Sequence, residues 1–199
     1  MKIYKEGSTR TAEEDDALFA SVKEIVANVR AKGDEALSYY NVKFGGVATA
    51  SFRVTDAELR QALDGLAPEL RAAIEKAAAN IKRFAQLQLG CSQPLAATET
   101  EPGVFLGHRV IPVDSCCCYV PGGNHPLFST ALMLVIPAKV AGVKRVCAAV
   151  PPMKGSRLPH PATLAALKIA GADEVYGLGG AQAIAAFAYG TRSVAPVSM

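Results

Sequence analysis

The feature that most constrains the fold is the alternation of apolar strand-like and helix-like segments after residue 104. Apolar runs at 116–120, 144–152 and 173–180 are each followed by a helical pattern, at 126–142, 161–172 and 181–190. Consecutive parallel strands need crossover connections of this kind, and helices then cover the sheet. The sequence therefore predicts an α/β fold containing a partial Rossmann-like parallel βαβαβα unit.

Residues 1–103 follow the period of a helix instead. Thr55 and Glu58 have the spacing of a capping box, and a short strand is expected at 50–54. One apolar stripe ends before a stop at Gly33 and comprises Leu18, Val22, Ile25, Val26 and Val29; a second lies in a long amphipathic helix and comprises Leu70, Ile74, Ala77, Ala78, Ile81 and Phe84. We predict a helical N-terminal region (1–103), serving as a scaffold or dimerisation arm, and an incomplete nucleotide-binding-like α/β domain (104–199). Residues 104–113 resemble a strand pair or a β-hairpin arm.

The composition argues against several classes of protein. Tryptophan is absent and no basic stripe is interleaved with aromatic residues, so no nucleic-acid partner is expected. The first residues lack the apolar segment of a signal peptide, and no uninterrupted apolar run is long enough for a membrane span. The chain has five cysteines, and an odd number of them argues against a disulfide framework. We therefore expect a protein of the reducing cytoplasm.

Two glycine-rich turns follow predicted strands, "YVPGGNHP" at 119–126 and "LGGAQA" at 178–183. Ligands of open parallel sheets bind at this edge, where the N-terminus of each following helix favours a phosphate or carboxylate. Pro126 suits the first position of a helix. Neither turn matches the G-x-G-x-x-G fingerprint, so each is either a tight strand-to-helix connection or a ligand loop. His125 is likewise either a ligand contact or a solvated loop residue.

Three adjacent cysteines, Cys116–Cys118, precede the first of these turns. Side chains alternate along a strand, so two of them can lie in the core and one on the other face. Zinc ligands usually have C-x₂₋₄-C spacing, which is absent here, and Cys91 and Cys147 are distant in sequence. A structural role, a metal site and an incidental reactive thiol are the three interpretations, and we assign no metal ligand to this chain.

The segments "CYVPGG", "STALMLVIPAKVAGV" and "GGAQAIAAFAYGT" resemble the histidinol dehydrogenase family. "VKEIVANVRAKGDEAL" and "IKRFAQLQL" are similar to the opening helices of that family, so the resemblance covers nearly the whole chain. Residues 99–123 are most similar to a paralogous branch that includes sulfopropanediol dehydrogenases.

The resemblance implies a zinc- and NAD-dependent oxidation of an alcohol, through an aldehyde, to a carboxylate by cytoplasmic homo-oligomers. Tyr119 and Gln182 match cofactor-contacting residues, and Gly122 and Gly123 belong to the same cofactor turn. Tyr119 and Gln182 are both expected at the carboxyl ends of adjacent strands. In the family the zinc ligands, the acid/base pair and most substrate contacts follow the part matched here, so we assign no catalytic residue.

Two interpretations follow from the resemblance. In one, the chain is the N-terminal part of such a dehydrogenase, binding NAD weakly and inactive alone. In the other, it is a non-catalytic module for weak nucleotide binding or for assembly.

Overall fold

The structure, a computed structural model, describes residues 12–122 and 125–199. Within this part the helices are α1 Ala12–Lys32, α2 Asp34–Lys43, α3 Asp56–Asp64, α4 Pro68–Gly90, α5 Phe128–Val140, α6 Pro161–Ala170 and α7 Gly180–Tyr189. The strands are β1 Arg53–Val54, β2 Leu95–Glu101, β3 Val104–His108, β4 Ser115–Tyr119, β5 Arg145–Ala149 and β6 Glu174–Tyr176. No helix of the described residues combines the length and apolar character needed to cross a membrane.

The central sheet has the strand order β1-β6-β5-β4. β4, β5 and β6 are parallel and are connected through α5 and α6, which confirms the predicted α/β fold. β1 adds a short antiparallel strand, with Arg53 opposite Tyr176. A strand of the N-terminal region therefore completes one edge of the sheet.

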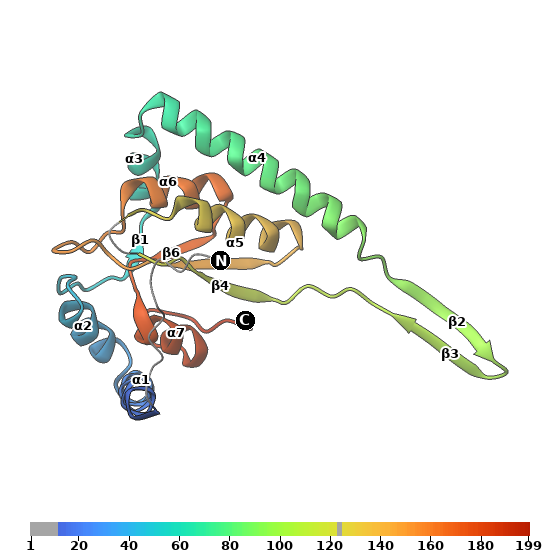
Figure 1. Cartoon of the computed structure of the whole chain (residues 1–199), viewed down its shortest axis with the longest axis horizontal. Coiled ribbons are helices and arrows are strands. Elements are labelled where there is room, and N and C mark those ends of the chain that lie inside the picture. Colours follow the sequence, from blue (N-terminus) through green and yellow to red (C-terminus); the bar gives the residue numbers. More distant parts are fainter. Residues whose placement is uncertain (1–11, 123–124) are drawn as a thin grey trace, which may run out of the picture.

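Helices cover both faces of this sheet (Figure 1). On one face α5 and α6 pack beneath α3 and α4, and on the other α7 packs against α1 and α2. The predicted helical region thus contributes to both layers, and its residues share cores with those of the α/β region.

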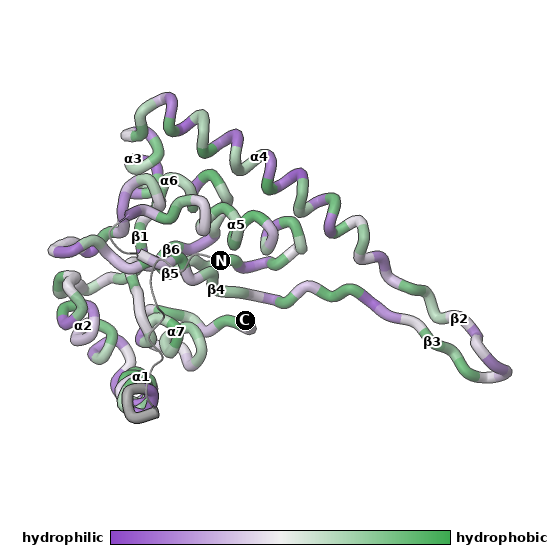
Figure 2. The backbone as a smooth tube through the Cα atoms, in the orientation of Figure 1, coloured by the Kyte–Doolittle hydropathy of each residue, from purple (hydrophilic) through white to green (hydrophobic). Residues whose placement is uncertain are grey.

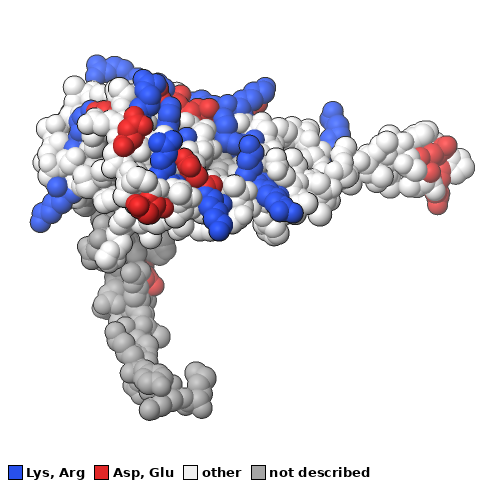
Figure 3. Space-filling view, turned by 90° about the horizontal axis from the view of Figure 1, so that it is seen from above, with Lys and Arg blue, Asp and Glu red and all other residues white. Residues whose placement is uncertain are grey.

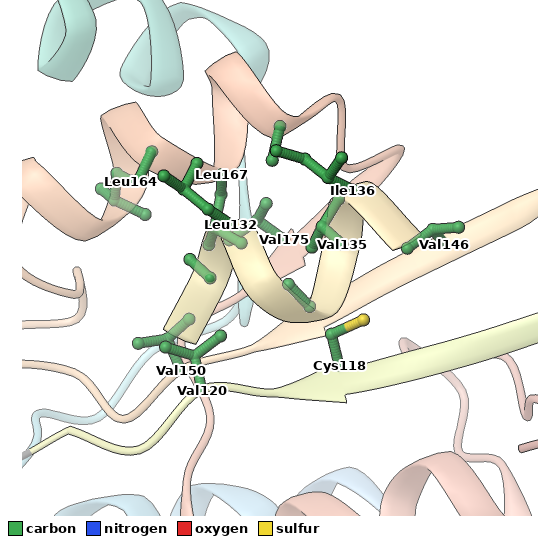
Figure 4. Packing of buried hydrophobic residues seen from close by; sticks show 14 of the residues in the cluster. Cys118, Val120, Leu132, Val135, Ile136, Val146, Val150, Leu164, Leu167 and Val175 are labelled. Carbon is green, nitrogen blue, oxygen red and sulfur yellow. The ribbon is translucent and has the colours of Figure 1, made fainter. Parts of the chain in front are cut away.

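The larger core lies between β4, β5, β6 and the α5–α6 pair (Figure 4). Val120, Val135, Leu167 and Val175 are almost completely buried there. Each such side chain contributes roughly 1.5–3 kcal/mol by leaving water. The second core holds Val29, Leu37, Tyr40, Tyr176 and Phe187 on the opposite face.

Local signals in the sequence explain several helix boundaries. Thr55 accepts the N–H of Glu58 while the Glu58 carboxylate accepts the N–H of Thr55, so the predicted capping box is confirmed. Gly171 ends α6 in the left-handed conformation, at φ 82°. The prediction for Pro126 is wrong, because α5 begins two residues later with Leu127 as its N-cap.

The amphipathic helices bury only part of their predicted stripes. In α1 Ile25 and Val29 are buried, whereas Leu18 and Val22 are exposed. In α4 Ile74 and Ala78 are buried, whereas the Phe84 side chain is 62% exposed. The apolar pattern therefore continues beyond the part of each helix that packs on the sheet.

β2 and β3 form an antiparallel hairpin that extends away from the sheet beyond the end of α4 (Figure 1). A hairpin is present, but its expected position within 104–113 is wrong, because only β3 lies there and its partner β2 begins at Leu95. The boundary predicted between residues 103 and 104 falls in the turn of this hairpin. Every residue from 86 to 112 is exposed. We call residues 86–112 the arm.

A partly buried polar network lies at the amino ends of β5 and β6. Arg145 donates from Nε and Nη2 to the two carboxylate oxygens of Glu174, at 3.2 and 3.0 Å. The Tyr176 hydroxyl donates to the same carboxylate at 2.8 Å. Arg145 also donates to the carbonyls of Ala195 and Pro196, so the network holds this late segment beside the sheet.

Candidate functional site

The two predicted turns meet at the carboxyl edge of the sheet. Tyr119 ends β4, and its hydroxyl accepts the backbone N–H of Gly180 at 3.0 Å. The expectation that Tyr119 and Gln182 follow adjacent strands is wrong, because β5 lies between β4 and β6. The Tyr119 side chain spans this gap and joins the first turn to the N-terminus of α7.

Gln182 lies in the first turn of α7 and is only 2% exposed. Its Oε1 has no hydrogen-bond partner among the described residues. No side chain caps α7, and Gly180 has a φ of 65° that favours glycine. A Cβ at Gly180 would lie 2.7 Å from Gln182 Oε1. Buried amide oxygens are normally paired, so this atom is an acceptor suited to a ligand hydroxyl or amide donor.

Pro151, directly after β5, packs between the two glycine-rich turns. A Cβ at Gly179 would lie 2.5 Å from Pro151 Cγ, and one at Gly122 would lie 3.0 Å from Pro151 Cβ. Packing on Pro151 therefore requires glycine at position 179 and leaves little room for a side chain at Gly122, whatever the turns bind. Gly123, the other predicted glycine, lies outside the described residues.

A pocket of about 120 Å³ lies beside the first turn, between the ends of β4 and β5 and the start of α6. Its lining includes Gly122, His125, Pro151, His160 and Thr163. His160 Nδ1 accepts the N–H of Ala162 and so caps α6. This role of His160 was not predicted from the sequence, although a histidine immediately before Pro161 at a helix start is a signal for it.

The cysteine triplet divides between the two faces of β4. Cys116 and Cys118 are buried in the larger core, while Cys117 is half-buried and packs against the second core. This confirms the predicted alternation. Across the described residues, no three His, Cys, Asp or Glu side chains are grouped so as to hold a metal ion.

A family model described as histidinol dehydrogenase matches residues 8–199. The chain belongs to the histidinol dehydrogenase family. It is 46% identical over 179 residues to the histidinol dehydrogenase of Methanosarcina barkeri, which covers 89% of this chain and 40% of that relative. "Histidinol dehydrogenase homolog 1" of Mesorhizobium japonicum is 40% identical over 183 residues, which is 92% of this chain and 36% of that relative.

The crystal structure of histidinol dehydrogenase from Elizabethkingia anophelis superposes with a TM-score of 0.85 at 33% identity. The superposition covers 96% of this chain and 42% of that one. This chain therefore spans about two fifths of the length of these histidinol dehydrogenases. The fold described here therefore corresponds to about two fifths of such a relative.

Proposed function

We propose that this chain is the nucleotide-binding part of a zinc- and NAD-dependent dehydrogenase that oxidises a small alcohol, through an aldehyde, to a carboxylate. The observation that carries the proposal is Gln182 Oε1, buried and without a partner at the N-terminus of α7. The dipole of this helix end favours a pyrophosphate, and Oε1 suits a ribose hydroxyl.

Tyr119 and Gln182 are the residues that would hold the cofactor. Tyr119 positions the start of α7 through its bond to Gly180, and its ring lies beside the same turn. Bound NAD supplies hydride acceptance; these residues supply orientation and hydrogen bonds only. We assign the zinc ligands and the acid/base pair to the part of the relatives outside this match, because the described residues offer no fitting group. The working protein is proposed to be a cytoplasmic homo-oligomer.

On its own we expect this chain to bind NAD with a dissociation constant on the order of a millimolar, near −4 kcal/mol. We expect no NADH formation with histidinol or with sulfopropanediol. These two alcohols represent the two branches of the family that the sequence resembles.

The test is a titration with NAD, followed by NMR, of the wild-type chain and the variant Gln182→Leu. Removing one neutral hydrogen bond should weaken binding roughly 2- to 12-fold. Tyr189→Phe, which changes an exposed residue at the far end of the same helix, is the matched control and should leave binding unchanged. Equal affinity of the wild type and Gln182→Leu would refute the assigned role.

The second candidate is a non-catalytic module for weak nucleotide binding or assembly. The exposed arm favours an assembly role, since such a surface suits a protein contact. An absorbance assay for NADH with added zinc tests what the two candidates share: turnover by this chain alone would contradict both proposals.

A further inference from the structure

Hydrophobic residues, green in Figure 2, recur along the arm, and the large ones are exposed. Phe105 is 62% exposed, Leu106 58% and Ile111 71%. Phe105 lies opposite Glu99 and Leu106 opposite Thr98, so adjacent residues of β3 place a large apolar side chain on each face of the hairpin. An isolated two-stranded hairpin is only marginally stable, and its free edges favour a further contact.

The arm is also acidic at its end. Glu99 and Glu101 are exposed on β2 beside the turn, and Figure 3 shows this acidic group at the far end of the arm. Lys and Arg side chains gather on the face that carries α4 (Figure 3). Lys76, Lys82 and Arg83 of α4 are exposed, and none forms an ion pair with another described residue.

A groove of about 430 Å³ lies between α4, α5 and α6, beside these cations. Ala78, Ile136, Val140 and Ile169 supply apolar lining, and Lys82 and Lys139 also line it. Lys139 is already paired with Asp173 at 2.9 Å, which leaves Lys82 as the cation facing an incoming acidic segment. The groove therefore matches the arm in both apolar character and charge.

We propose that the arm of one copy docks in the α4–α5–α6 groove of a second copy. Phe105, which shares a face of the hairpin with Glu99, occupies the apolar part, and Glu99 and Glu101 lie against Lys82 and Arg83. The base of the arm, at Gln86 and Leu89, lines the groove of its own copy. The β2–β3 hairpin of that copy points away from the groove (Figure 1), so the hairpin is free to reach a second copy. A two-fold axis makes the contact reciprocal, with both arms used and no open end. This contact rests on the homo-oligomer proposed above and names the surface through which its copies associate. The contact forms without NAD and without zinc.

The test is a charge exchange followed by sedimentation velocity at low and high salt. Glu99→Lys with Glu101→Lys reverses the charge of the arm. Lys82→Glu with Arg83→Glu reverses the charge beside the groove. Each double variant alone should self-associate about tenfold or more weakly, since attraction becomes repulsion. An equimolar mixture should restore the dimer, because each arm then meets a groove of opposite charge. Higher salt should weaken the wild-type dimer.

Lys23→Glu with Lys154→Glu reverses two exposed charges elsewhere and should leave the dimer unchanged. All substituted side chains are exposed, and far-UV circular dichroism checks that each variant is folded. A wild-type chain that stays monomeric at high micromolar concentration would overturn the proposal. That result would favour another part of the longer protein as the occupant of the groove. Failure of the mixture to restore association would overturn it as well. NAD titration of the same variants separates failure of the arm–groove contact from failure of the proposed cofactor site.

Discussion

Four of the five thiols lie in or against the packed cores around the sheet, and only Cys91 is exposed. Burial raises the pKa of Cys118 to about 12 and that of Cys147 to about 12. Burial also raises the pKa of Cys116 and Cys117. Because the thiolate is the reactive form, these four groups are inert in the folded protein. The interpretation of the triplet as a structural element is therefore favoured over a reactive thiol.

We predict that one thiol of five reacts rapidly with a disulfide reagent near pH 8. The Cys91→Ser variant should lose the fast phase, and denaturant should expose the remaining four thiols. The measurement is the release of the reporter thiolate over time. Fast reaction of two or more groups in the wild type would contradict the burial of the triplet.

Glu174 gives the fold a dependence on pH. Hydrogen bonds from Arg145 outweigh burial and hold the pKa of the Glu174 carboxyl at about 2, against an ordinary value of 4.5. A lowered carboxyl pKa stabilises the fold at pH values above the unfolded pKa. That contribution is lost as the pH falls from about 4.5 to about 2.

We predict that Glu174→Gln lowers the free energy of unfolding at pH 7 by roughly 1.5–3 kcal/mol, the range for a hydrogen bond to a charged group. The variant should also lose less stability than the wild type between pH 4.5 and 2. Urea unfolding at several pH values measures both effects. Glu75→Gln, which breaks an exposed pair with Arg71, should cost less than about 0.5 kcal/mol. Parallel pH profiles for wild type and Glu174→Gln would rule out this role for the carboxylate.

At the scale of the elements, the turns after β4 and β6 depend on Pro151. We predict that Gly179→Ala lowers the free energy of unfolding by roughly 1–3 kcal/mol, because its Cβ would overlap the proline ring. Gly90→Ala is the matched control: a Cβ there meets no atom within 4 Å, so stability should stay the same or rise slightly. Thermal unfolding compares the two. Equal stability of both variants would show that the turn can move away from Pro151.

Much of this arrangement could be predicted from the sequence, because apolar periodicity and capping residues act locally. The three parallel strands, the capping box at Thr55 and the alternation of the cysteines are of this kind. The position of β5 between the two turns could not be predicted from the sequence, because strand order depends on contacts between residues far apart in the chain. The role of Pro151 and the pocket at His160 were missed for the same reason: they depend on contacts between separate turns.

At the scale of the whole molecule, the arm contrasts with the body. Its residues make no contribution to either core, so its local unfolding should cost little. We predict that, among sites beyond residue 20, a glutamate-specific protease cuts first at Glu99, and that trypsin cuts first at Arg109. Mass spectrometry of early fragments locates the cuts. If the arm docks as proposed, cleavage should slow as protein concentration rises. Early cleavage within α5, α6 or α7 would contradict the contrast in stability.

The antiparallel strand β1 has a consequence for how the chain folds during synthesis. Among the described strands β1 pairs with β6 alone, and β6 leaves the ribosome about 120 residues later. Helices α1 and α2 are covered by α7, which emerges later still. Within the described residues, helices α1 and α2 therefore lack part of their packing partner until α7 has been made. Contacts so distant in sequence form slowly, and apolar side chains such as Val29 and Leu37 stay accessible meanwhile. A nascent chain stalled before residue 174 should accordingly hold its α1–α2 segment open to chaperones, while one stalled after α7 has emerged should release it.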